Sequence, residues 1–271
     1  MTRFVVVPQW QGSPSTRAMA LIDGADAIAG DLPSSSCLRV EVPFEAGESL
    51  GTGVARASAL QRTRIRVDEA LQALPSDRVI VIGGDDGVAV PAISHVADTD
   101  LAVVWFDAHG ALHAPNEQRS RAYSSMALRS TLSDIAPGLG IASGRLAAER
   151  IVLAGARALD DEEQAFMAER GIRHVTADQV AHRIADTVAS LGASRVYIHI
   201  DLDVLDPAHI AGVADAQPFG LEAAALIDAI ASVRAALPLA GASIGGFAPH
   251  TPAAAVDDMG TILRVVGALA S

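Results

Sequence analysis

Aspartate and histidine side chains recur at short spacings directly after apolar runs of this sequence. Asp107 and His109 follow the run LAVVWF, and Asp201 and Asp203 follow the run VYIHI. Residues two apart at the end of an extended strand point to the same side, so each pair presents its side chains together. Three carboxylates and one imidazole that converge repel strongly unless a cation lies among them. Oxygen ligands with one imidazole favour a manganese-like divalent ion over a thiolate-seeking metal, although zinc is also possible.

Two further apolar runs end in residues of chemical interest. The run VIVI is followed by GGDDG, which contains Asp85 and Asp86, and the run ASIGG is followed by a segment that contains His250. Asp85 and Asp86 could instead form a turn with Gly87. GGDDG also lacks the glycine spacing and the lysine of a phosphate-binding loop, which argues against nucleotide binding.

Some acidic and histidine residues have simpler structural explanations. The pair Asp206-Pro207 is typical of a turn or a helix start, because aspartates commonly cap helices and close turns. His199 lies inside the apolar run VYIHI, a position that indicates a core histidine with its hydrogen bonds satisfied.

The elements that must position these residues alternate between short apolar runs and longer segments of helical period. The runs predict strands at Phe4–Val7, Leu38–Val42, Val79–Ile82, Leu101–Phe106, Ile151–Leu153, His174–Val175, Val196–Ile200 and Ala242–Ile244. The periodic segments predict helices at Val54–Ala73, Glu162–Arg170, Asp178–Leu191, Glu222–Ala236 and Met259–Leu269. This rhythm predicts an α/β fold in which helices cover both faces of a mostly parallel sheet. Ligands bind at the carboxyl ends of the strands of such a sheet, where the acidic pairs lie.

Composition restricts the class of protein. The chain has 271 residues, half of them hydrophobic, and we expect one domain over residues 1–271 because no linker-like segment divides it. A net charge of -12 argues against nucleic acid as a partner. The lone Cys37 excludes an internal disulfide and fits a reducing compartment. The N-terminal apolar run is too short for a signal peptide and no run reaches the length of a membrane span, so we expect a cytoplasmic protein without membrane contact.

These motifs resemble those of the arginase, agmatinase and formiminoglutamase family, the ureohydrolases. The likeness extends from GGDDG to Thr251-Pro252, and its most specific parts are the WFDAH and DLDVLDP stretches. The resemblance implies a three-layer α/β/α fold with an eight-stranded parallel sheet, assembled as a trimer or hexamer. It also implies a two-manganese centre that activates a hydroxide for attack on the amidine or guanidine carbon of a small substrate.

The family's six metal-ligand positions are only partly matched. The resemblance assigns one complete ligand set, that of a single ion, to four residues: Asp107, His109, Asp201 and Asp203. The neighbouring ion would lose two ligands, because Asp86 stands at the family's histidine and Ala111 at the family's second aspartate. Alanine offers no lone pair, whereas Asp86 could still bind weakly. We therefore expect one firmly held manganese ion and a weak or vacant second position.

Positions that the resemblance assigns to catalysis have also changed. Ser124 and Ser125 stand where the family has His-Gly, and Pro249 stands where it has an acidic residue. His113 occupies a position that faces the substrate in the family, and His250 adjoins Pro249. The candidates for moving protons or orienting substrate are therefore His113, Ser124 and His250.

One segment of the substrate pocket resembles the family more closely. The stretch AGARALD is similar to the family's G-x-R-D-x-D segment, which makes Asp160 and Glu163 candidates for substrate binding. Ser120 is a third candidate. Both acidic residues could equally be favoured at a helix N-terminus by the helix dipole.

These observations favour a divergent ureohydrolase-type hydrolase that cleaves a C–N bond of a small molecule through a metal-bound water. Classical arginase activity is doubtful, because loss of one general acid–base group commonly costs about 10²–10⁴ in rate. A catalytically silent subunit or small-molecule sensor would show the same losses. An enzyme with an organic cofactor is disfavoured, since no phosphate-binding glycine motif occurs.

Overall fold

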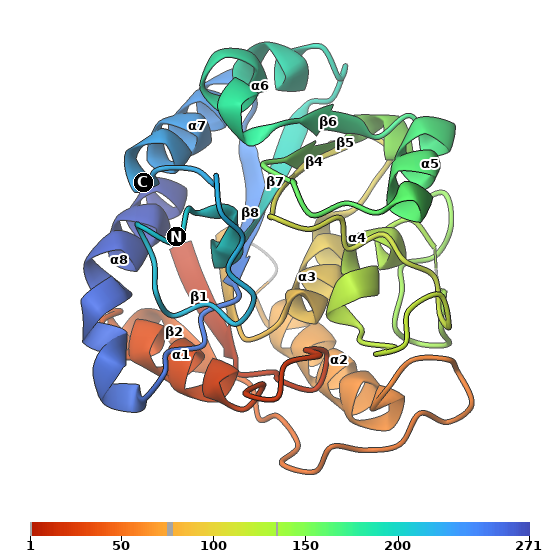
Figure 1. Cartoon of the computed structure of the whole chain (residues 1–271), viewed down its shortest axis with the longest axis vertical. Coiled ribbons are helices and arrows are strands. Elements are labelled where there is room, and N and C mark those ends of the chain that lie inside the picture. The colour runs from red at the N-terminus through yellow and green to blue at the C-terminus, as the bar shows by residue number, and fades with distance from the viewer. Residues whose placement is uncertain (1, 75–77, 134) are drawn as a thin grey trace.

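Eight strands of the part of the chain that the structure describes form one parallel sheet. The computed structural model describes residues 2–74, 78–133 and 135–271. The strands run in the order β2-β1-β3-β8-β7-β4-β5-β6, and every neighbouring pair is parallel (Figure 1). Their bounds are β1 Thr2–Val7, β2 Cys37–Arg39, β3 Arg78–Gly83, β4 Leu101–Phe106, β5 Ile151–Ala154, β6 Arg173–Val175, β7 Arg195–Asp201 and β8 Leu239–Gly245.

Helices cover both faces of this sheet, so the molecule has three layers (Figure 1). Side chains of α1, α6, α7 and α8 pack on one face, and those of α2, α3, α4 and α5 on the other. The helices are α1 Ala20–Gly30, α2 Ala57–Gln72, α3 Ala89–Val96, α4 Ala127–Ser130, α5 Asp161–Arg170, α6 Val180–Ala189, α7 Ala223–Ala236 and α8 Val256–Ala270. The predicted α/β fold with a parallel eight-stranded sheet is confirmed.

The central strand β4 shows why the sequence folds in this way. Its six residues are all fully buried. Leu101, Val103 and Trp105 pack with the α2–α5 layer, whereas the residues between them pack with the opposite layer. A strand that is covered on both faces needs apolar side chains at every position, and the run LAVVWF supplies them. Among the described residues, no helix is long and apolar enough to cross a bilayer.

Differences from the sequence-based expectations are local. The structure contains α1, α3 and α4, which the sequence analysis did not predict, and β2 spans Cys37–Arg39 rather than the predicted Leu38–Val42. Helix α3 spans eight residues and carries Pro91 in its first turn, where proline is tolerated because the missing N–H would have no partner in the helix. Gly24 in α1 faces the backbone of residue 247 so closely that a β-carbon would lie 1.9 Å from that carbonyl oxygen. Close packing against the backbone of Phe247, rather than helical propensity, therefore holds α1 in place.

The order of the strands brings distant segments of sequence to one place. Strands β3 and β4 follow one another in the sequence, yet β8 and β7 lie between them in the sheet. The carboxyl ends of β3, β7 and β4 therefore lie near the centre of the same edge, where open α/β sheets bind ligands. The expectation of one domain over residues 1–271 stays a prediction.

Candidate metal centre and active site

An acidic cavity opens at this edge of the sheet. Its volume is about 710 Å³, and its lining comes from the ends of β3, β4 and β7 and from the loops around them. The carboxylates in the lining are Asp85, Asp86, Asp107, Asp160, Glu163, Asp201, Asp203 and Asp215. Arg157 also lines the cavity, but its guanidinium nitrogens donate to backbone carbonyl oxygens, including those of Asp203 and Gln217. The cavity therefore favours cations.

The end of β4 fixes the carboxylate of Asp107. Trp105 Nε1 donates to one of its oxygens at 2.9 Å, and the backbone N–H of His109 donates to the other at 2.7 Å. Asp107 is almost fully buried. A buried carboxylate with both oxygens held in this way keeps one orientation and still has free lone pairs that face the cavity.

The end of β7 brings two more carboxylates to the same place. Asp201 accepts the backbone N–H of Asp203 at 2.8 Å, which starts a short 3₁₀ turn at Leu202–Val204. Asp203 in turn accepts the backbone N–H of Ala108 at 2.9 Å through one oxygen. This last bond joins the ends of β7 and β4 directly.

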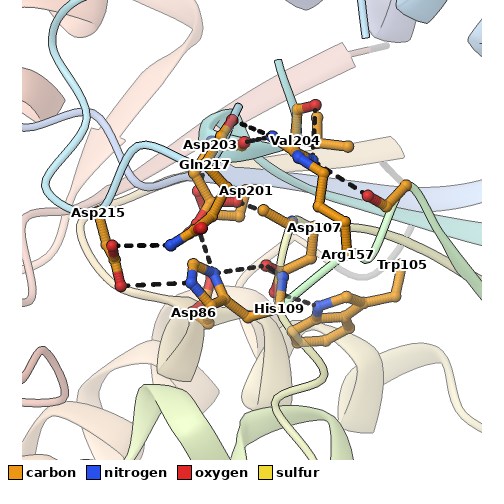
Figure 2. Close-up of polar contacts among 12 residues, drawn as sticks. Asp86, Trp105, Asp107, His109, Arg157, Asp201, Asp203, Val204, Asp215 and Gln217 are labelled. Atoms are coloured by element: carbon orange, nitrogen blue, oxygen red, sulfur yellow. Dashed lines mark hydrogen bonds and ion pairs between the residues drawn. The ribbon is translucent and has the colours of Figure 1, made fainter. Parts of the chain in front are cut away.

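His109 completes the cluster (Figure 2). Its Nδ1 lies 2.8 Å from the second oxygen of Asp203 and 3.5 Å from Asp107. Asp107, His109 and Asp203 each offer a ligand atom, and these three atoms lie within 4.8 Å of one another. The structure thus brings together three of the four residues expected to hold the first ion, and Asp201 lines the same cavity.

Electrostatics at the cluster confirm that the carboxylates repel one another. Burial and then the charges of Asp201 and Asp107 raise the pKa of Asp203 well above its usual range. Burial would lower the pKa of His109, but its bonds to Asp107 and Asp203 outweigh that effect and raise the pKa to about 12. Protons therefore compensate the negative charge, and a divalent cation could replace them.

The donor set fits manganese. It consists of carboxylate oxygens and one imidazole nitrogen, with no thiolate in the cavity lining, and such ligands suit a hard or borderline divalent ion. Backbone N–H groups and Trp105 hold the ligands from behind, which is the kind of outer support that metal sites require.

Asp85 and Asp86 are neighbours with different surroundings. Asp85 accepts bonds from Gln9, from the backbone of Gly12 and from the backbone of Gly87, so it closes the turn as the structural alternative proposed. Burial raises the pKa of Asp85 to about 6. Asp86 also lines the cavity, and one of its oxygens lies 3.2 Å from His199 Nε2.

His199 is a buried histidine that adjoins the candidate site. Its Nδ1 lies 2.8 Å from the hydroxyl of Ser243, and its ring lies 3.8 Å from the Trp105 ring between centroids. Burial lowers the pKa of His199 to about 3, so the imidazole is neutral. The sequence analysis correctly placed His199 in the core but missed its contact with Asp86. The two-residue spacing of His199 and Asp201 on β7 places both side chains on the same face of the sheet. This spacing could have indicated that His199 adjoins the site.

Ala111 lies where a second ion would need a ligand. It lines the cavity, is buried, and has a φ of 52°. This left-handed conformation is uncommon for alanine and several-fold enriched for aspartate and asparagine. The backbone at position 111 therefore suits an aspartate or an asparagine better than the alanine that stands there.

A second cluster lies across the cavity. His113 Nε2 is 2.7 Å from Asp160 and 3.0 Å from Gln118 Nε2, and His113 Nδ1 is 3.3 Å from Glu163. Asp160 and Glu163 also form the capping box of α5, in which each side chain accepts the backbone N–H of the other residue. The helix-terminus explanation is therefore confirmed, and both acids also line the cavity, where their role in substrate binding stays a prediction.

The remaining candidates differ in position. Ser124 lines the cavity at the start of a 3₁₀ turn. His250 is exposed, lies 2.8 Å from a guanidinium nitrogen of Arg17 and does not line the cavity. Ser120 is also exposed and outside the lining, with its hydroxyl 3.5 Å from Gln118. The structure therefore places His250 and Ser120 outside the cavity lining, and their roles stay predictions.

Comparison with known proteins defines the class. The model of the arginase family matches residues 17–259, so the chain belongs to the arginase family. It is 32% identical to the arginase of Bacillus caldovelox over 197 residues, which cover 68% of this chain and 64% of that protein. It is 27% identical to the agmatinase of Halalkalibacterium halodurans over 194 residues, covering 70% and 61%. The aligned part thus spans less than two thirds of either relative.

A solved structure supports the fold. The arginase of Entamoeba histolytica, crystallised with L-ornithine, superimposes with a TM-score of 0.85 over 99% of this chain and 97% of that one, at 17% identity. The predicted family and fold are confirmed by these comparisons.

Proposed function

We propose that this protein is a metal-dependent hydrolase that cleaves an amidine, guanidine or related C–N bond of a small molecule. The observation that carries the proposal is the convergence of Asp107, His109 and Asp203 in an acidic cavity of a chain that belongs to the arginase family. Four residues would hold a divalent ion, which we propose to be manganese: Asp107, His109, Asp201 and Asp203. When bound, such an ion would lower the pKa of a coordinated water and so supply the nucleophile.

The neighbouring metal position would be weak or empty. Ala111 supplies no ligand, and Asp86 already contacts His199 at 3.2 Å. Binding of Asp86 to a cation would compete with that contact.

Residues of the chain itself would bind and orient the substrate. The many carboxylates of the lining attract an amidinium or guanidinium cation, and the one lining arginine is already engaged by carbonyl oxygens. His113 lies between two carboxylates, with Nε2 2.7 Å from Asp160 and Nδ1 3.3 Å from Glu163, so it could hold or pass on a proton. Ser124 lines the cavity, where its hydroxyl could orient a polar group of the substrate or pass on a proton.

A catalytically silent subunit or small-molecule sensor is the second candidate. Two replacements favour it, because Ala111 lacks a metal-binding group and Ser124 cannot supply an imidazole. A cytoplasmic location and a trimeric or hexameric assembly of identical subunits stay predictions.

A substrate panel separates the two candidates. Manganese-loaded protein should release urea, ammonia or an amide from at least one member of a panel of amidines, guanidines and formamides. Turnover should stop on chelation, and L-arginine should be a poor substrate, because the family's histidine at position 124 is missing. Zinc-, iron- and nickel-loaded samples complete the panel. If none of these samples turns over any substrate although the ion is bound, the silent subunit is the correct reading.

A further inference from the structure

The loop between β7 and α7 places an acidic residue over the metal cluster. Asp215 Oδ2 lies 3.3 Å from His109 Nε2, on the opposite side of the ring from Asp203 (Figure 2). His109 Nε2 is buried and makes no well-directed hydrogen bond among the described residues. Asp215 is thus the carboxylate positioned to receive the proton of this nitrogen.

The loop that carries Asp215 is tied to the metal ligands. Arg157 donates to the carbonyl oxygens of Gln217 at 2.8 Å and Pro218 at 2.9 Å, and also to that of Asp203 at 3.0 Å. The Arg157 guanidinium therefore links the loop that carries Asp215 to the 3₁₀ turn that carries Asp203. The Gln217 side chain then donates to Asp215 Oδ1 at 3.0 Å, which orients the carboxylate (Figure 2).

The other end of the loop is also fixed. The backbone N–H of Gly220 donates to Asp206 at 3.1 Å, and a β-carbon on Gly220 would lie 2.6 Å from the Arg157 guanidinium. Glycine at this position therefore lets the loop approach Arg157 closely. On the N-terminal side of Asp215, the backbone N–H of Gly212 donates to Asp258 at 2.7 Å. The position of Asp215 is set by the fold.

We infer that Asp215 is the positioning residue of His109. By contacting Nε2, Asp215 keeps Nδ1 of the His109 ring turned toward the other metal ligands. A histidine that binds a metal through one nitrogen commonly donates its other N–H to a carboxylate, which fixes the tautomer and orientation of the ring and raises its basicity. Asp215 is 73% exposed, so its ion pair contributes little stability by itself, and its effect acts through His109. The inference rests on the proposed metal-dependent function.

Metal affinity tests this inference without an activity assay. Manganese(II) chloride alone is titrated into the metal-free full chain, and free manganese is followed by electron paramagnetic resonance. Asp215→Ala should weaken manganese binding by about 10–100-fold, the usual cost of losing such a partner. Asp215→Asn should restore most of the affinity, because its carbonyl oxygen still accepts the N–H. Asp228→Ala removes another exposed charge, from α7, and should leave manganese affinity unchanged.

A spectroscopic readout completes the test. In zinc-loaded protein labelled with ¹⁵N, the Nε2–H of His109 should be detected in the wild type and in Asp215→Asn, and should exchange away in Asp215→Ala. Wild-type affinity in Asp215→Ala would overturn the inference while leaving the proposed function intact. Failure of the wild type to bind manganese would instead overturn both.

Discussion

Replacing Asp203 with alanine should abolish tight manganese binding and turnover, whereas replacing Asp86 should change both only slightly. Asp203 contributes an oxygen 2.8 Å from His109 Nδ1 and joins the ends of β7 and β4 through Ala108. Its loss removes a ligand and frees its neighbours to move. Manganese affinity should therefore fall by more than the roughly 10–100-fold that loss of an outer partner costs.

Asp86 occupies a different place. It contacts His199 and is not among the four proposed ligands of the first ion, so we expect Asp86→Ala to keep that ion. Affinity and turnover are measured on matched preparations, with circular dichroism as the check of folding. Asp203→Asn is the companion variant, because it keeps the bond to Ala108 but removes the charge. Equal losses in the Asp203 and Asp86 variants would contradict a one-ion centre.

Replacing Ala111 with aspartate should create a usable second metal position. Ala111 already lines the cavity with a φ of 52°, a conformation that aspartate adopts more readily than alanine. The new carboxylate would add to those of Asp86, Asp107 and Asp201, which line the same cavity. We expect the manganese content to rise from about one ion toward two per chain, with a gain in turnover.

Ala111→Asn is the matched control for this prediction. Asparagine adopts the same left-handed conformation and has nearly the same shape, but it carries no charge. It should relieve the backbone strain without raising the manganese content. If Ala111→Asp and Ala111→Asn both bind one ion, the missing carboxylate at position 111 does not explain a weak second metal position.

The sequence predicted the sheet better than the helices that cover it. Runs such as LAVVWF are apolar at every position, and only a strand buried on both faces needs this pattern. Helices α1 and α3 were missed because their sequences contain Gly24 and Pro91, which lower helical propensity. Both helices form because of tertiary contacts that propensity does not report.

The site shows a similar division. Spacing of two residues at strand ends was enough to predict the pairs Asp107 with His109 and Asp201 with Asp203. Nothing in the sequence marked Asp215, because a long loop brings it to His109 and Arg157 holds that loop. His250 adjoins the segment at the end of β8, but its side chain turns to Arg17 and away from the cavity. Adjacency in sequence does not fix side-chain direction in a loop.

The count of bound ions tests the central claim most directly. Protein loaded with excess manganese, freed of loosely bound metal by gel filtration and analysed by mass spectrometry, should retain about one ion per chain. Retention of no ion would show that the four-ligand cluster does not bind manganese. Retention of two would show that the second position is intact without Ala111.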